Sequence, residues 1–429
     1  MAKHNTLCAL DVGSSQINAV LAKRDLLNNK IEVLSTSQVV CRGLRGGVVV
    51  NIPETAKSIT QTIELCEEKV RAADLAPVNS VILGVRGNHF ASFNNKGAYN
   101  IARTDKEITA TDVESVLEIA KAVPISQDRE VLHAIAQDFW VDRQKGVPNP
   151  VGMEGSLLEV DVHILTGTSS HLNNVVKSVN QAGFRVEQTI YGLFALADTV
   201  VTPEEKQQGC LLVDLGGETL GIGVFSEGSL CYSKEIGLGS DSISRDLAYA
   251  LRTSLINANR LKEEHGACLS SLVEPEEEVE FYGIDGRETR RVKKKTIVEI
   301  IQPRVEEIVT LIGKDLETAG WLEVIVPGGV IITGGGSLLR GLSDATTELL
   351  GVPSRLGLPQ IESLEASGDY LTNPAFATAV SLLHYSQHPP LWGVSANGKS
   401  RLGLDLGIGR KSRNGVGRRV QNFFEELFS

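Results

Sequence analysis

Several features of common protein classes are missing from this sequence, and each absence narrows the possibilities. No apolar run approaches the ~20 residues that a helix needs to cross a membrane. The first residues, Met1 to His4, lead directly into an apolar strand and leave no room for a signal peptide, so we expect a cytoplasmic protein. The six cysteines include no close pair at metal-ligand or redox spacing, which favours small buried thiols over disulfides or a metal site.

Excess positive charge is also missing from most of the chain. The formal net charge is −11, and nucleic acids are held chiefly by positive charge laid against phosphates, so we expect no nucleic-acid partner. The segment from Lys399 to Ser429 differs, because it carries seven Lys or Arg residues and three acids, a net charge of +4. The rest of the chain therefore carries −15.

The 429 residues predict about two to four domains, and 42% apolar residues with 42 glycines are enough for packed sheets with many turns. Two blocks share one pattern of strands followed by helices. The first has strands at Leu7–Val12, Ile17–Ala22, Ile31–Val40 and Val78–Val85, with a helix at Pro53–Ala73; the second has strands at Cys210–Asp214, Gly221–Phe225 and Ser229–Ile236, with helices from Ser240 to His265. This repetition predicts a duplicated α/β architecture.

Two insertions interrupt these blocks. Residues 86–165 contain their own strands, at Glu130–Val141 and Leu157–Leu165, and a helix at Thr111–Val123. Residues 241–295 contain two helices and a hairpin with its turn at Gly283–Gly286, followed by a long amphipathic helix at Thr296–Ala319. From Ser386 to Gly417 the composition of Pro, Gly, Ser, Asn and basic residues predicts a flexible linker.

Three glycine turns each follow a predicted strand. They consist of Asp11, Gly13, Ser14 and Ser15; of Asp214, Gly216, Gly217, Glu218 and Thr219; and of Gly334, Gly335 and Gly336, between strand Val330–Ile332 and helix Leu338–Leu350. In such turns the backbone N–H groups can point at an anion, while a preceding carboxylate holds hydrated Mg²⁺. Each turn alone is an ordinary hairpin or loop in most proteins, so the interpretation rests on their joint order and spacing.

Two other nucleotide-binding architectures are disfavoured by missing motifs. The chain has no GxxxxGK[ST] sequence, which argues against a P-loop NTPase. It also has no strand followed by GxGxxG, which argues against a dinucleotide-binding fold.

In this order, the three turns resemble the phosphate 1, phosphate 2 and adenosine motifs of the actin, Hsp70 and sugar-kinase superfamily. Within it, the chain resembles the FtsA cell-division family over nearly its whole length, including Cys41–Asn51 and Lys234–Ser240, which lie outside the general nucleotide motifs. The resemblance implies an actin-like duplicated ATPase fold with an inserted subdomain in place of the usual actin one. The implied subdomains are 1A (1–85, 166–208 and 365–388), 1C (86–165), 2A (209–240 and 296–364) and 2B (241–295), then a linker (389–417) and a C-terminal amphipathic helix (418–429).

The resemblance also assigns roles in binding ATP and Mg²⁺. The first two turns would clamp the phosphates with Asp11 and Asp214 holding Mg²⁺ through water, the three glycines of the third would back the adenosine, and Lys262 would contact the base. Asn259 stands where relatives commonly have Glu, so contact with the nucleoside is expected to be altered. Tyr191 and Gly192 stand where ATP-hydrolysing actins offer Gln or Glu, and neither can act as a general base at neutral pH, so we expect slow or undetectable hydrolysis.

The last twelve residues form a predicted amphipathic helix. One face is apolar (Val420, Phe423, Phe424, Leu427, Phe428), and Arg418 and Arg419 open the helix. An apolar stripe behind a basic tether suits an anionic membrane surface, although such a stripe can also dock on the protein's own body. Members of the FtsA family end in this way, which favours the membrane. A helix this short binds weakly alone, so polymerisation would have to supply many copies.

A run of basic residues lies in and after the second insertion, including Arg287, with Arg304 on the following helix. Such a run is commonly a solvated face. In the FtsA family this subdomain receives the C-terminal tail of the tubulin-like protein FtsZ, and Arg287 and Arg304 fall near the positions implied by that resemblance.

The resemblance as a whole implies a filament-forming protein that tethers the FtsZ ring to the cytoplasmic face of the membrane at the division septum and recruits other division proteins. Two alternatives remain open. One is an actin-like pilus-assembly protein, which lacks such a tail; the other is a small-molecule kinase of the superfamily, for which no catalytic acid stands out.

Overall fold

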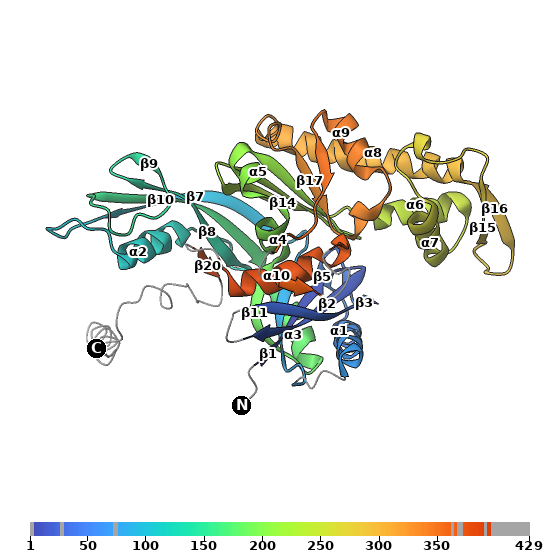
Figure 1. The fold of residues 1–429 in the computed structure, drawn as a ribbon, viewed down its shortest axis with the longest axis horizontal. Coiled ribbons are helices and arrows are strands. Elements are labelled where there is room, and N and C mark those ends of the chain that lie inside the picture. Colours follow the sequence, from blue (N-terminus) through green and yellow to red (C-terminus); the bar gives the residue numbers. More distant parts are fainter. Residues whose placement is uncertain are drawn as a thin grey trace.

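Two sheets with the same strand pattern form the centre of the molecule (Figure 1). The computed structural model describes residues 4–25, 30–71, 76–361, 364–366, 372–389 and 393–395. The first sheet has the order β11-β6-β1-β2-β3-β19. Its strands are β1 His4–Val12, β2 Gln16–Asp25, β3 Ile31–Val40, β6 Ser80–Val85, β11 Arg185–Tyr191 and β19 Leu364–Ala366.

The second sheet repeats the β11-β6-β1-β2-β3 part of this topology with the order β14-β13-β12-β17-β18, and among the described residues it has no counterpart of β19. Its strands are β12 Cys210–Leu215, β13 Leu220–Ser226, β14 Ser229–Ile236, β17 Val330–Thr333 and β18 Ser354–Leu356. In each sheet three antiparallel strands are extended by parallel ones, β6 beside β1 and β17 beside β12. The predicted duplication of the α/β architecture is confirmed.

Helices cover both sheets and complete two hydrophobic cores. Those packed with the first sheet are α1 Ile52–Lys69, α3 Ser169–Gln181, α4 Gly192–Val200 and α10 Ala377–Gln387; those of the second half are α5 Pro203–Gln208, α8 Lys294–Ala319 and α9 Leu342–Leu350. Side chains alternate along β12, so Leu212 joins the first core while Leu211 and Val213 join the second. One strand thus binds the two halves together.

The first insertion forms its own sheet and core on one side of the molecule (Figure 1). Its elements are β7 Ala91–Asn100, α2 Ala110–Lys121, β8 Arg129–Val141, β9 Gln144–Val147 and β10 Leu157–Thr168. It is also anchored to the second half, because Ser92 donates a 2.6 Å hydrogen bond to the carbonyl of Ser233 on β14, and Gln137 donates one to the carbonyl of Leu230.

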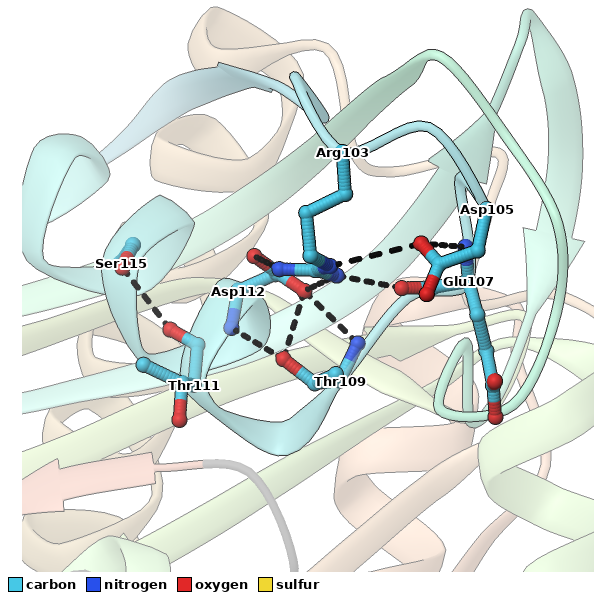
Figure 2. Close-up of polar contacts among 7 residues, drawn as sticks. All are labelled: Arg103, Asp105, Glu107, Thr109, Thr111, Asp112 and Ser115. Atoms are coloured by element: carbon cyan, nitrogen blue, oxygen red, sulfur yellow. Dashed lines mark hydrogen bonds and ion pairs between the residues drawn. The ribbon is translucent and has the colours of Figure 1, made fainter.

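The start of α2 is fixed by a polar network (Figure 2). Thr109 and Asp112 form a capping box, in which the Asp112 carboxylate accepts from the Thr109 amide at 2.7 Å. Arg103 reaches the same carboxylate through both terminal nitrogens, at 3.1 and 2.6 Å. Hydrogen bonding from Arg103 lowers the pKa of Asp112 to about 2.

The second insertion projects from the opposite side (Figure 1). It contains α6 Asp241–Leu251, α7 Leu255–His265 and the hairpin of β15 Glu278–Tyr282 and β16 Thr289–Lys293. Gly286 in the hairpin turn has a φ of +68°, a conformation that glycine adopts without strain.

Two segments differ from the sequence prediction. A helix was expected over Leu338–Leu350, but a 3₁₀ turn covers Gly335–Leu338 and α9 begins at Leu342, because Gly341 has a left-handed φ of +77° that breaks helical geometry. Residues 389–417 were expected to form a linker, yet Gly393–Ser395 form β20, which pairs with β8 opposite His133, Ala134 and Ile135. The remaining residues of that linker, except Pro389, and the predicted helix at 418–429 lie outside the described residues.

All six cysteines are free thiols, and five of them are buried. No helix within the described ranges is both long enough and apolar enough to cross a membrane.

Candidate functional site

The three glycine turns meet in a cleft between the two halves of the molecule. Two adjoining cavities lie there, of about 650 and 80 Å³, and Ser14, Ser15, Gly217 and Gly335 line both. The larger cavity has the size of small-molecule sites, which are roughly 300–1,000 Å³. All thirteen residues predicted for ATP line one or both cavities: Asp11, Gly13, Ser14, Ser15, Asp214, Gly216, Gly217, Glu218, Thr219, Lys262, Gly334, Gly335 and Gly336.

The first two turns touch each other across the cleft. Ser15 donates a 2.5 Å hydrogen bond to Asp241 at the start of α6. A Cβ added to Gly217 would lie 1.9 Å from the Ser15 hydroxyl oxygen, so only glycine permits this approach. A small hairpin of β4 Leu44–Arg45 and β5 Val48–Val49 closes over both turns. At its tip, Gly46 donates its amide to Glu218 and Gly47 donates to Ser14, both at 2.7 Å.

The third turn packs tightly against the second. Gly334 has a φ of +84°, and a Cβ there would lie 2.4 Å from a carboxylate oxygen of Asp214 and 2.7 Å from the carbonyl oxygen of Leu215. A glycine is therefore required by both the backbone conformation and the space.

Helix α7 supplies one wall of the larger cavity. Lys262 lines it and donates a 3.3 Å hydrogen bond to the carbonyl of Ser240, and burial lowers the pKa of its amine. Asn259 also lines it, and its side-chain oxygen is buried without a partner among the described residues. Because buried polar atoms are nearly always paired, this oxygen fits a ligand that donates a hydrogen bond, such as a ribose hydroxyl.

Arg86, which the sequence reasoning missed, joins the two carboxylates predicted to hold Mg²⁺. Its Nη2 donates to both oxygens of Asp11, at 3.2 and 3.1 Å, and its Nη1 lies 2.9 Å from Oδ2 of Asp214. Burial alone would lower the pKa of Arg86, but Asp11 and Asp214 outweigh that effect and raise it. Burial also raises the pKa of Asp214. Arg86 follows β6 directly, at the strand end where α/β sheets bind ligands. Its position after a predicted strand could therefore have indicated a site residue from the sequence.

The fully buried Tyr191 and the partly buried Glu235 form a second pair close to Arg86. The Tyr191 hydroxyl donates to Glu235 Oε1 at 2.7 Å, and burial raises the pKa of Tyr191 well above its usual value. Burial likewise raises the pKa of Glu235 to about 7. Neither side chain lines the two cavities. Tyr191 is thus committed to an internal hydrogen bond, and Glu235 is a second residue that sequence reasoning missed.

The cleft fits a nucleotide better than it fits a hydrated Mg²⁺ held by both carboxylates. Three of the four carboxylate oxygens of Asp11 and Asp214 already accept hydrogen bonds from Arg86. The fourth, Oδ1 of Asp214, is buried without a partner among the described residues. Of the four oxygens expected to hold the waters of a metal ion, one receives no hydrogen bond from the described part of the chain.

The residues predicted to bind a partner lie away from the cleft cavities. Arg304 on α8 is engaged by Asp246 on α6, at 2.6 and 2.9 Å. Much of the basic run is paired with carboxylates: Arg290 with Glu288, Arg291 with Glu280, Lys293 with Glu276 and Lys294 with Glu277. Arg287, beside the hairpin turn, forms no ion pair with any described residue. The predicted membrane-binding residues, Arg418 to Phe428, lie outside the described ranges.

Solved structures with a similar fold define the class of this protein. A PilM–PilN type IV pilus biogenesis complex matches with a TM-score of 0.62 at 17% identity, covering 89% of this chain and 99% of that one. MreB5 of Spiroplasma citri bound to AMPPNP matches with a TM-score of 0.51 at 12% identity, covering 90% and 96%. Together with the duplicated sheets, these likenesses define an actin-like fold, as expected.

Sequence comparison identifies the family within that class. The model described as Cell division protein FtsA matches residues 211–381, and the model described as SHS2 domain inserted in FTSA matches residues 87–166. The Cell division protein FtsA of Pseudomonas aeruginosa is 33% identical over 389 residues, 91% of each chain. That of Escherichia coli K12 is 30% identical over 391 residues, covering 90% of this chain and 91% of its own. The chain belongs to the FtsA family of cell-division proteins.

Proposed function

We propose that this protein binds ATP in the cleft between its halves and acts as an actin-like component of the division machinery. The observation that carries the proposal is the gathering of all thirteen predicted nucleotide residues around two adjoining cavities, beside the oxygen of Asn259 that no described residue contacts with a hydrogen bond. The likeness to MreB5 structures bound to AMPPNP and to ADP supports a nucleotide in this position.

Titration with a fluorescent ATP analogue tests the proposed nucleotide site. Lys262→Ala should weaken binding about tenfold, because a lost buried polar contact of about 1.4 kcal/mol corresponds to that factor. Lys314→Ala, on the exposed face of α8, is the matched control and should bind as the wild type does. Saturable binding that is equal in both variants would place the nucleotide elsewhere, and no binding to the wild type would refute the function.

The C-terminal residues are proposed to attach the protein to the cytoplasmic face of the membrane. The support is the apolar stripe of Val420, Phe423, Phe424, Leu427 and Phe428 beside a segment of +4 charge. Deletion of residues 418–429 should abolish pelleting with anionic liposomes. Exchanging Phe424 and Glu425 keeps composition and charge but breaks the stripe, so it should reduce pelleting too. If the exchanged variant pellets like the wild type, charge alone accounts for binding.

The second insertion is proposed to bind the C-terminal tail of FtsZ, which would let filaments of this protein tether the FtsZ ring and gather other division proteins. Arg287 is the sharper test residue, since reversing Arg304 would also leave Asp246 without its partner. Arg287→Glu should weaken binding of an FtsZ tail peptide at least fivefold. Lys314→Glu, at an exposed cation of α8 that forms no ion pair with a described residue, is the control. Equal affinities for the wild type and Arg287→Glu would contradict this assignment.

A further inference from the structure

The guanidinium of Arg86 contacts the two carboxylates that the resemblance assigns to a hydrated metal ion. It bridges Asp11 at the end of the first sheet's central strand and Asp214 at the equivalent point of the second sheet. Its side chain is 10% exposed, and Thr378 on α10 holds it further by accepting a 2.8 Å hydrogen bond. Three segments distant in the sequence thus fix a single positive charge between the two phosphate turns.

We propose that Arg86 replaces the divalent cation as the group that joins these two carboxylates, so that the cleft binds nucleotide with little dependence on Mg²⁺. The proposal rests on the nucleotide-binding function proposed above and assigns Arg86 as a positioning residue for it. Asp11 and Asp214 are then the arginine's partners in this chain.

Charge and hydrogen bonding both support this assignment. Two buried carboxylates would repel each other and an incoming polyphosphate, and a fixed guanidinium offsets part of that repulsion without a metal. A divalent ion that used the same carboxylates would lie next to a buried guanidinium, whose charge has the same sign. It would also have to compete with charge-assisted hydrogen bonds, which are stronger than neutral ones.

Arg86 also retains a donor that no described residue uses. Its Nε atom is buried and has no partner among the described residues, and the side chain lines the smaller cavity between the phosphate turns. Unpaired buried donors are rare. A phosphate oxygen of the nucleotide is the acceptor that the surrounding turns are built to receive.

A purely structural role for Arg86 and the proposed role lead to different effects of magnesium on nucleotide affinity when Arg86 is replaced. If Arg86 only held the two halves together, its loss would weaken nucleotide binding by the same factor with and without magnesium. If it replaces the metal ion, its loss makes binding depend on magnesium. The ratio of dissociation constants in EDTA and in millimolar Mg²⁺ separates these roles.

The experiment is titration of full-length protein with a fluorescent ATP analogue under both conditions. The wild type should lose less than about threefold affinity in EDTA, whereas Arg86→Gln should lose about tenfold or more. Arg86→Lys keeps a cation at this position, so its nucleotide affinity should again depend only weakly on Mg²⁺. Similar ratios for the wild type and Arg86→Gln would overturn the proposal.

If Arg86→Gln fails to fold, the affinity of the wild type with and without Mg²⁺ still tests the proposal. A wild-type loss of tenfold or more in EDTA overturns the role of Arg86 while leaving nucleotide binding intact. An absence of binding both in EDTA and in millimolar Mg²⁺ refutes the proposed function itself, and the inference with it.

Discussion

His163 makes stability sensitive to mild acid where the first insertion meets the second sheet. Its ring on β10 is fully buried, with Nδ1 2.7 Å from Asn94 Oδ1 and Nε2 2.8 Å from the hydroxyl oxygen of Ser233 on β14. Asn94 uses its amide nitrogen to donate to the carbonyl of Cys231, so its oxygen faces the ring. The neutral ring therefore donates through Nδ1 and accepts from Ser233 through Nε2.

The size of the effect follows from the two pKa values. Burial lowers the pKa of His163 to about 4, whereas an unfolded histidine has a pKa of about 6.5. Between these values the unfolded chain binds a proton that the folded chain does not, so stability falls as the pH falls from 6.5 towards 4. Linkage gives a loss of about 1.3 kcal/mol between pH 7.5 and pH 5.5 for this single group.

Urea unfolding of the wild type and of His163→Gln at both pH values measures this contribution. The destabilisation caused by the substitution at pH 7.5 should be about 1.3 kcal/mol larger than at pH 5.5, because glutamine does not titrate. Ile256→Gln, at an exposed position of α7, changes no titratable group and should retain the pH dependence of the wild type. An equal effect of His163→Gln at both pH values would refute the reasoning.

Three further predictions test other parts of the molecule. Asp112→Ala removes the α2 cap and the partner of Arg103, so urea unfolding should show a loss of roughly 2–4 kcal/mol; a loss like that of exposed Glu114→Ala would contradict this. Gly217→Ala should weaken binding of the ATP analogue about tenfold or more by pushing the phosphate turns apart, unlike Gly283→Ala in the distant hairpin. ATP turnover, followed as phosphate release, should be far below one per second, since Tyr191 is committed to an internal hydrogen bond, and a rate near that value would show that a catalytic group has been overlooked.

Local patterns in the sequence were sufficient to predict the glycine turns and the strands beside them, but not β18 or β19 at the sheet edges. Each strand of the two central blocks has an apolar run ended by turn residues, and Asp11 and Asp214 mark equivalent points of the two copies. Their placement opposite each other, as a clamp on the phosphates, came from the resemblance to the actin superfamily. The resemblance to a known family was needed to select Lys262, because a lysine on a helix carries no such pattern.

Arg86 and Glu235 were missed because their roles arise only from tertiary contacts. Arg86 is separated from Asp214 by 128 positions in the chain and meets it only when the two sheets face each other. Glu235 lies in β14, a strand whose mixed polar and apolar sequence indicates one face in solvent. Its partial burial comes from contacts with Tyr191 and the first half of the molecule. The strand β20 was missed for a similar reason, since a three-residue segment pairs only because β8 offers it an edge.

The pairing of β20 with β8 determines how a pull on the C-terminal part of the chain would enter the folded body. Tension beyond Ser395 would be borne by three backbone pairings along β8, one of them opposite His133. The ring of His133 accepts the amide hydrogen of Tyr191, and the Tyr191 hydroxyl reaches Glu235 beside the phosphate turns. The strand that precedes the predicted membrane tail is thus linked, through His133 and Tyr191, to Glu235 near the proposed nucleotide cleft, so mechanical load on the tail would be felt close to that cleft.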